Sequence, residues 1–325
     1  MKKVVVTREV FDETIEYLSQ RFDVTSNQDD RKLSDRELAL MLTNAIGVQT
    51  ASSDRVDQRF LDLCPRAKII ANTAVGYNNI DIPECTKRGV MVTNTPGVLD
   101  DSVADFAVGL MIAASRRMGE GERFVREGRW ESVYLKQMLG KDVCGATLGL
   151  LGFGRIGKVI AQRVAGFNMK VLYHTRNKAP ESVEAELRAT YVSKEELLRT
   201  SDFVVLILPY SKETHHYIGE TELGLMKGSS ILVNVARGGI VDDDALIKAL
   251  RDGKIFAAGL DVFEGEPKLK DEFSTLNNVV LTPHIGSASE TTRKAMAMTA
   301  AMNLSVALYE GNPPPNILNP EVLSA

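Results

Sequence analysis

The sequence predicts an α/β protein of two domains, each built on a parallel β-sheet covered by helices. Its 325 residues exceed what one hydrophobic core needs and suit two cores. Short apolar strand-like runs alternate with helix-like segments along the chain, which is the order that parallel sheets require. We predict a first domain of residues 1–101 with 292–325, and a second domain of residues 102–291.

The first hundred residues contain four candidate strands and one clear helix. The helix is expected around Val10–Ser19, and a turn, Val75-Gly76-Tyr77, follows the third strand. The candidate strands are 3–6, 45–50, 67–73 and 90–95.

A long apolar segment, 101–121, predicts one continuous helix with acidic residues at its start and basic residues near its end, as the helix dipole prefers. It is apolar on more than one face, so it should be buried between layers or domains. A second long helix is expected over 287–309, returning to the first domain. The NPPPNILNP segment that follows cannot continue a helix.

The most regular pattern lies between these two helices and predicts a doubly wound sheet. Helices are expected at 155–167 and 242–252. Six apolar runs predict strands: 146–154, 169–174, 202–209, 229–236, 256–262 and 278–283.

Composition excludes several classes of function. The net charge of −4 has both signs interspersed and forms no basic stripe, so a nucleic-acid partner is not expected. Cys64, Cys85 and Cys144 are far apart and odd in number, so we expect free thiols and no disulfide framework or metal site. The apolar run 106–114 is about half the ~20 residues that span a bilayer. With no signal-peptide pattern at the start, we expect a cytoplasmic protein.

The first motif that carries chemistry is Gly152-Phe153-Gly154-Arg155-Ile156-Gly157, which directly follows a predicted strand and opens a predicted helix. In that setting Gly152 permits a tight turn, Gly154 lets the backbone approach a pyrophosphate, and Gly157 lets helix and strand pack closely. The motif predicts a dinucleotide site. A turn without ligand and an S-adenosylmethionine site are the alternatives. The six-strand count and the downstream residues argue against the second.

The end of the next strand indicates which dinucleotide binds. An NAD site usually has Asp or Glu there, about 20 residues on, to hold the ribose 2′-hydroxyl. This chain has Thr175 and Arg176 instead. Arg176 could pair with a 2′-phosphate, although solvated surface arginines are common. We therefore expect NADP to be preferred, with NAD possible.

Three polar residues follow three different strands of the second domain: Arg237, Glu266 and His284. Ligands of open α/β sheets bind beyond the carboxyl ends of the strands, so these side chains should face one crevice. An arginine can bind a substrate carboxylate through two hydrogen bonds, and a histidine can donate a proton to a new alkoxide. A carboxylate beside the histidine can orient its imidazole. Together they predict hydride transfer to a 2-keto acid.

Each of these residues also has an ordinary structural interpretation, as a surface ion pair or a loop residue. His284 is the strongest candidate because Pro283 and Gly286 fix its backbone. His174 lacks such a setting, and His215 and His216 are interpreted as surface residues. No His/Cys cluster for zinc is apparent, which disfavours metal-assisted alcohol oxidation.

The chain resembles the D-isomer-specific 2-hydroxyacid dehydrogenases in five segments: GFGRIG, SDFVVLILPYSKETHH, NVARGGIVDDDAL, AAGLDVFEGEP and PHIGSAS. The resemblance covers nearly the whole chain. TAVGYNNID and SSDRVDQRFLD make the chain most similar to the glyoxylate/hydroxypyruvate and 2-ketogluconate reductases. The resemblance implies a flavodoxin-like substrate domain, a Rossmann-like cofactor domain, an active site in the interdomain cleft, and a homodimer formed through the cofactor domains.

The resemblance also implies roles for individual residues. Arg237, Glu266 and His284 match the catalytic Arg, Glu and His, and the backbone N–H groups at Val75 and Gly76 match the turn that binds the substrate carboxylate. Asp261 matches the residue that holds the nicotinamide carboxamide. Further residues are implied along the cofactor groove: Val103, Leu208, Pro209, Thr214, Val235 and Gly286. Thr175 departs from the aspartate that NAD-preferring members usually have.

The predicted activity is reduction of a small polar 2-keto acid, and the resemblance alone implies that the product is the D-2-hydroxy acid. Two segments are candidates for contacting the C3 side of the substrate: the loop Thr50-Ala51-Ser52-Ser53 and the region after Trp130. Within the loop, Ser53 is the expected substrate contact. A dinucleotide-sensing corepressor-like protein on the same fold is the alternative from a different class. Phosphite oxidation is disfavoured because its enzymes have lysine where this chain has Val75.

Overall fold

The computed structural model describes residues 1–31 and 33–324. The chain forms two compact units: unit 1 is residues 1–99 with 288–325, and unit 2 is residues 100–287. The observed boundaries, after residues 99 and 287, lie two and four residues before the expected ones, after residues 101 and 291. The reason is local, since the next helix begins at Asp100 and the last long helix is capped by Ser289.

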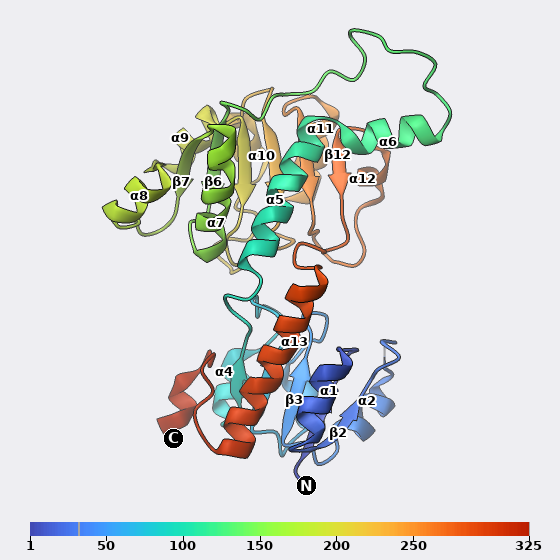
Figure 1. The fold of residues 1–325 in the computed structure, drawn as a ribbon, viewed down its shortest axis with the longest axis vertical. Helices are drawn as coiled ribbons and strands as arrows, with labels where there is room; N and C mark the ends of the chain where they lie inside the picture. Colours follow the sequence, from blue (N-terminus) through green and yellow to red (C-terminus); the bar gives the residue numbers. More distant parts are fainter. Residues whose placement is uncertain (32, 325) are drawn as a thin grey trace. The chain divides into compact units, whose positions relative to one another are not determined.

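Unit 1 has a parallel sheet whose described strands lie in the order β2-β1-β3-β4-β5, the flavodoxin-like order. Helices cover both faces (Figure 1). Its elements are β1 (Lys3–Val6), α1 (Asp12–Ser19), β2 (Asp23–Ser26), α2 (Asp35–Leu42), β3 (Gly47–Thr50), α3 (Gln58–Leu63), β4 (Ile69–Asn72), α4 (Ile82–Lys87), β5 (Met91–Thr93) and α13 (Glu290–Ser305), which continues as a π-helical turn, Val306–Glu310. A 3₁₀ turn, Pro320–Ser324, follows.

Side-chain alternation along the strands builds two apolar layers in unit 1. Val4 and Val6 of β1 face one side of the sheet and pack with Leu304 of α13, whereas Val5 faces the other side. There Val5 packs with Leu42 of α2. The sheet is therefore buried on both faces, as parallel sheets are.

Unit 2, all of whose residues are described, has a seven-stranded parallel sheet in the order β12-β11-β10-β9-β6-β7-β8. The strand order reverses between β6 and β9, the switch point at which such sheets bind dinucleotides. Its elements are α5 (Asp100–Ser115), α6 (Met118–Arg126), β6 (Thr147–Leu151), α7 (Arg155–Val164), a 3₁₀ turn (Ala165–Phe167), β7 (Lys170–His174), α8 (Glu181–Leu187), β8 (Ala189–Tyr191), α9 (Lys194–Thr200), β9 (Phe203–Leu206), α10 (Glu220–Leu225), β10 (Ile231–Asn234), α11 (Asp243–Arg251), β11 (Ala257–Leu260), α12 (Asp271–Thr275) and β12 (Val279–Leu281).

Two expectations about these elements were wrong. The segment 101–121 is two helices, because Arg117 takes a left-handed backbone conformation (φ 54°) that ends α5 and redirects the chain into α6. The six-strand count missed β8, which pairs with β7 at the edge of the sheet, and β2 was also unforeseen. The buried face of α5 agrees with its apolar composition, since Leu110 packs against Gly259 of β11.

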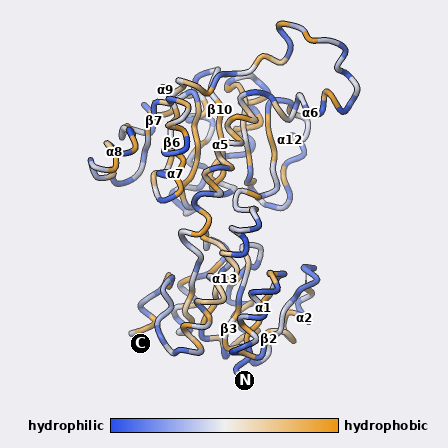
Figure 2. The backbone as a smooth tube through the Cα atoms, in the orientation of Figure 1, coloured by the Kyte–Doolittle hydropathy of each residue, from blue (hydrophilic) through white to orange (hydrophobic). Residues whose placement is uncertain are grey.

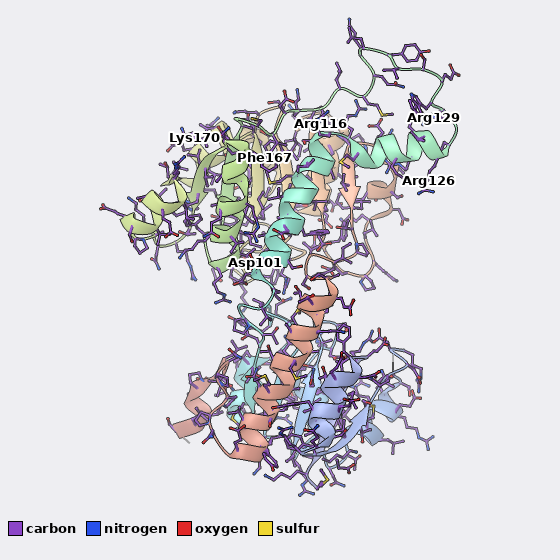
Figure 3. All side chains as sticks on the ribbon, in the orientation of Figure 1. Asp101, Arg116, Arg126, Arg129, Phe167 and Lys170 are labelled. Atoms are coloured by element: carbon purple, nitrogen blue, oxygen red, sulfur yellow. The ribbon has the colours of Figure 1, made fainter. Side chains whose placement is uncertain are left out.

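Residues 127–142, here called the arm, leave α6 at the end marked by Arg126 and Arg129 and extend away from the rest of unit 2 (Figures 1 and 3). Five large apolar side chains of the arm are exposed, and Figure 2 shows apolar and polar residues mixed along it. They are Trp130, Val133, Tyr134, Leu135 and Leu139. Among the described residues, no helix is both long and apolar enough to cross a membrane.

Candidate active site

Two of the three predicted catalytic residues form a close pair at the carboxyl edge of the unit 2 sheet. Glu266 follows β11 and His284 follows β12, and the two strands are neighbours in the sheet. Nδ1 of His284 lies 2.7 Å from Oε2 of Glu266, and both side chains are about one third exposed. The carboxylate thus fixes one ring nitrogen and leaves the other for a substrate.

The loop that carries Glu266 holds its carboxylate in place. Oε1 of Glu266 accepts a hydrogen bond from the backbone N–H of Phe263 at 3.4 Å, while Oε2 faces His284. One oxygen is therefore anchored to the backbone of its own loop and the other orients the imidazole.

Arg237 follows β10 and is partly buried. Its Nη1 donates to the carbonyl of Ala236 at 2.6 Å. Burial lowers the pKa of Arg237 from its ordinary value, and the negative charge of Glu266 opposes that shift. Because β10, β11 and β12 are parallel neighbours in the sheet, all three predicted catalytic residues follow strand ends at the same edge.

Asp261 fixes the loop that carries His284. Its Oδ1 accepts from the backbone N–H of Ile285 at 2.8 Å and from the hydroxyl of Thr282 at 2.7 Å, and its Oδ2 accepts from the N–H of Gly286 at 2.8 Å. Its carbonyl also accepts from the N–H of His284 at 2.9 Å. His284 has a left-handed backbone (φ 55°), a conformation costly for a residue with a side chain. These bonds offset that cost. Sequence reasoning did not find this role.

The glycine motif has the shape that a dinucleotide needs. Gly152 has φ 107° and lies so close to the carbonyl of Ile207 that a side chain there would collide with it. A Cβ at Gly157 would stand 2.7 Å from the carbonyl of Gly152. Gly154 is the N-cap of α7, with open space at its Cβ position and no side-chain cap. The N-terminus of α7 is thus open to an anion.

Comparisons with known proteins identify the family. Residues 108–286 match the family model described as D-isomer specific 2-hydroxyacid dehydrogenase, NAD binding domain. The chain is also 48% identical to a glyoxylate reductase of Thermococcus onnurineus, over 99% of this chain and 97% of that protein. The chain belongs to the D-isomer specific 2-hydroxyacid dehydrogenase family. It is therefore a nicotinamide-dependent enzyme, as the sequence predicted.

Solved structures agree with this placement. A glyoxylate reductase from Paecilomyes thermophila is similar with a TM-score of 0.86 and 31% identity, covering 98% of both chains. An NADPH-dependent glyoxylate/hydroxypyruvate reductase from Sinorhizobium meliloti, in complex with NADP and malonate, is similar with a TM-score of 0.83 and 30% identity. That likeness covers 97% of this chain and 96% of the other.

In this dehydrogenase, the end of β7 presents Thr175 and Arg176. The hydroxyl of Thr175 donates to the carbonyl of Asn177 at 2.6 Å, which holds the turn, and Arg176 is exposed. The pKa of Glu213 is lowered, first by the hydroxyl of Ser211 and more weakly by the positive charge of Arg176. Arg176 therefore lies near the loop that follows β9, beside the switch point.

The other predicted groove residues of the dehydrogenase lie in loops or helices around the same strand ends. Arg155, at the first position of α7, is exposed and pairs with Asp100 at 3.3 Å. Val103 of α5 lies beside Gly286, and the hydroxyl of Thr214 donates to the carbonyl of Pro209 at 2.9 Å. The remaining members are Ile156 and Leu208, which are partly buried, and Val235, which is buried.

The predicted substrate residues of unit 1 follow β3 and β4. The carbonyl of Val75 accepts from Asn94 at 2.9 Å, so the N–H of Gly76, in the same planar peptide, points the opposite way. Ser52 and Ser53 line a hollow of about 400 Å³, together with Asp54 and Asn79. Both features lie at the carboxyl ends of the unit 1 strands.

Proposed function

We propose that the enzyme reduces small polar 2-keto acids, glyoxylate and hydroxypyruvate first among them, to D-2-hydroxy acids, with NADPH as the preferred reductant. The observation that carries the proposal is the 2.7 Å contact between His284 and Glu266, on the same sheet edge as Arg237 and the open glycine motif. The similarity to a glyoxylate reductase and to a glyoxylate/hydroxypyruvate reductase supports the choice of substrate.

Each residue of the trio has a distinct role. Arg237 binds the substrate carboxylate through its planar guanidinium, and its burial strengthens that ion pair by excluding water. His284 donates a proton to the carbonyl oxygen as that oxygen becomes an alkoxide. Glu266 holds the imidazole in place through its 2.7 Å contact with Nδ1. When bound at the glycine motif, reduced nicotinamide supplies the hydride.

Arg176 and the absence of an acid at Thr175 support NADPH over NADH. The guanidinium of Arg176 is exposed at the end of β7, where the ribose of a dinucleotide lies in sheets of this order. It would meet a 2′-phosphate in a charge-assisted pair. The structurally similar reductase of Sinorhizobium meliloti is NADPH-dependent.

The residues that distinguish one substrate from another come from unit 1. The N–H of Gly76, with that of Val75, supplies donors for the substrate carboxylate, and Ser53 supplies a hydroxyl for the C3 side. A site that hydrogen-bonds a substrate hydroxyl penalises an analogue that lacks it. Hydroxypyruvate should therefore exceed pyruvate as a substrate, and 2-ketogluconate is a further candidate.

The arm supports a homodimer formed through unit 2. Leu135 is 93% exposed and Val133 82%, and Trp130 and Tyr134 are exposed beside them. An apolar patch of this kind marks a protein interface, and aromatic residues are enriched at such interfaces. A second copy of the chain is the partner we propose for it.

The deciding experiment is a panel of 2-keto acids assayed with NADPH and with NADH. We expect the highest kcat/KM for hydroxypyruvate and glyoxylate with NADPH, and a D-product. Higher kcat/KM for phenylpyruvate or 2-ketoisocaproate would contradict the substrate assignment. Turnover of no 2-keto acid would favour the dinucleotide-sensing alternative.

A further inference from the structure

The fold of unit 2 brings together three side chains of the kind that bind transition metals: His215, His216 and Glu264. One ligand atom from each lies within 4.8 Å of the others. The histidines precede α10 and the glutamate follows β11, 48 positions beyond His216. We propose that this cluster is a binding site for Zn²⁺. No local sequence pattern predicts it, since the two histidines alone are interpreted as surface residues.

The spacing of the donor atoms fits zinc. Nε2 of His216 lies 3.3 Å from both carboxylate oxygens of Glu264. Two donors that each bind Zn²⁺ at 2.0–2.2 Å with tetrahedral angles lie about 3.4 Å apart. A zinc ion can therefore bind between them with little movement of the side chains. Two imidazoles and a carboxylate suit zinc, whereas Mg²⁺ and Ca²⁺ prefer all-oxygen sites.

Neighbouring groups orient both imidazoles for such an ion. The hydroxyl of Tyr210 lies 3.2 Å from Nδ1 of His215, and Oδ2 of Asp242 lies 3.8 Å from Nδ1 of His216. A polar group thus lies on the Nδ1 side of each ring, as in metal sites where an outer group orients the ligating histidine.

The two imidazoles lie side by side, since their ring centroids are 3.9 Å apart and their planes are inclined by 25°. An ordinary ion pair with Glu264 would need His216 alone and gives no reason for His215 to stack beside it.

The backbone holds the ligands before any ion binds. The N–H of His216 donates to the carbonyl of Gly239 at 2.8 Å, and the N–H of Glu264 donates to Oδ2 of Asp243 at 3.1 Å. Gly238 lies so close to the carbonyl of Phe263 that a side chain there would collide with it. The loops therefore pack tightly, and the side chains are exposed enough for water to complete the coordination.

Calorimetric titration of the chelator-stripped full chain with ZnCl₂, in the absence of substrate and cofactor, tests the proposal. We expect one equivalent to bind, and His215→Ala, His216→Ala and Glu264→Gln each to weaken that binding by at least about 100-fold, since losing even an outer-shell partner costs about 10- to 100-fold. MgCl₂ should not compete. Because no turnover is measured, failure of this test is separable from failure of the proposed function.

Two controls separate this site from other zinc ligands of the chain. Cys144→Ser removes the exposed thiol and should leave the affinity unchanged. His284→Ala removes the other histidine that lies beside a carboxylate, and should also retain the zinc equivalent. X-ray absorption of the zinc-loaded protein should show two imidazole ligands. Retention of the equivalent in the His216→Ala and Glu264→Gln variants, or its loss in His284→Ala, would overturn the proposal.

Discussion

Nδ1 of His284 lies 2.7 Å from Oε2 of Glu266, although the two residues follow different strands. Replacing His284 by Ala should reduce turnover about 100- to 10,000-fold, the usual contribution of a general acid. NADPH binding should persist, because the glycine motif lies elsewhere on the sheet edge. Steady-state kinetics and fluorescence titration with NADPH measure the two effects. Turnover within tenfold of the wild-type rate would exclude His284 as the proton donor.

The Glu266→Gln variant should lose turnover while its NADPH affinity stays unchanged. The carboxylate lies 2.7 Å from Nδ1 of His284 and orients the imidazole, and a neutral amide forms a weaker hydrogen bond to that ring. We expect a loss of about fivefold to tenfold in kcat, since a hydrogen bond to a charged group contributes about 1 kcal/mol more than a neutral one. Steady-state kinetics and fluorescence titration with NADPH measure the two effects. A kcat equal to that of the wild type would contradict the pairing.

Replacing Arg176 by Asp should weaken NADPH binding by about 1.5–3 kcal/mol, the contribution of a hydrogen bond to a charged group. NADH binding should be maintained or improved. Arg199→Asp makes the same charge change on α9 and serves as the control. Dissociation constants for both cofactors provide the test, and equal NADPH affinity in wild type and Arg176→Asp would remove Arg176 from the site.

The Asp261→Asn variant should lose both activity and stability. Asp261 accepts hydrogen bonds at both oxygens from the loop that carries His284, and an amide nitrogen cannot replace either acceptor. We expect a loss of about 1–3 kcal/mol from an unsatisfied buried donor. Calorimetry measures the stability, and kcat reports whether the loop still positions His284 for proton donation. Reduced NADPH affinity with unchanged stability and kcat would show instead a role confined to the cofactor.

Burial raises the pKa of Asp243 to about 6, from an ordinary value of 3.8. The folded protein therefore takes up this proton more readily than the unfolded chain. The contribution of Asp243 to the free energy of unfolding therefore rises as pH falls through 6 toward 4. At pH values above both the folded and the unfolded pKa, the buried charge lowers the free energy of unfolding by up to about 3 kcal/mol.

Asp243→Asn removes that charge, so it should stabilise unit 2 relative to wild type by about 1–2 kcal/mol more at pH 8 than at pH 5. Thermal unfolding at the two pH values measures the difference. Asp252→Asn, which alters an exposed carboxylate at the end of the same helix, should show no such dependence. A stabilisation of Asp243→Asn that is equal at both pH values would exclude a buried charge as its cause.

The strands of unit 2 were predictable because buried parallel strands are continuous apolar runs, and the residues just after them reach one edge of the sheet. That reasoning placed Arg237, Glu266 and His284 near one another. β8 escaped detection because an edge strand of three residues, Ala189–Tyr191, has no apolar run to mark it.

Other features depend on contacts that no local pattern encodes. The end of α5 is set by the left-handed backbone of Arg117, a residue with no intrinsic preference for that conformation. The cluster of His215, His216 and Glu264 exists only because the loops after β9 and β11 meet. Asp261 illustrates a third case, since its bonds to the loop that carries His284 depend on how that loop returns to the sheet.

The course of the chain through unit 1 has a consequence for synthesis on the ribosome. Val4, Val6 and Ile69 pack against α13, whose residues are translated after all of unit 2. During synthesis, that apolar face of residues 1–99 therefore stays exposed until α13 has emerged. Unit 2 is a continuous segment that emerges earlier and can fold first. A nascent chain that stalls before residue 290 would therefore carry a complete unit 2 and a unit 1 exposed to chaperones, proteases and aggregation.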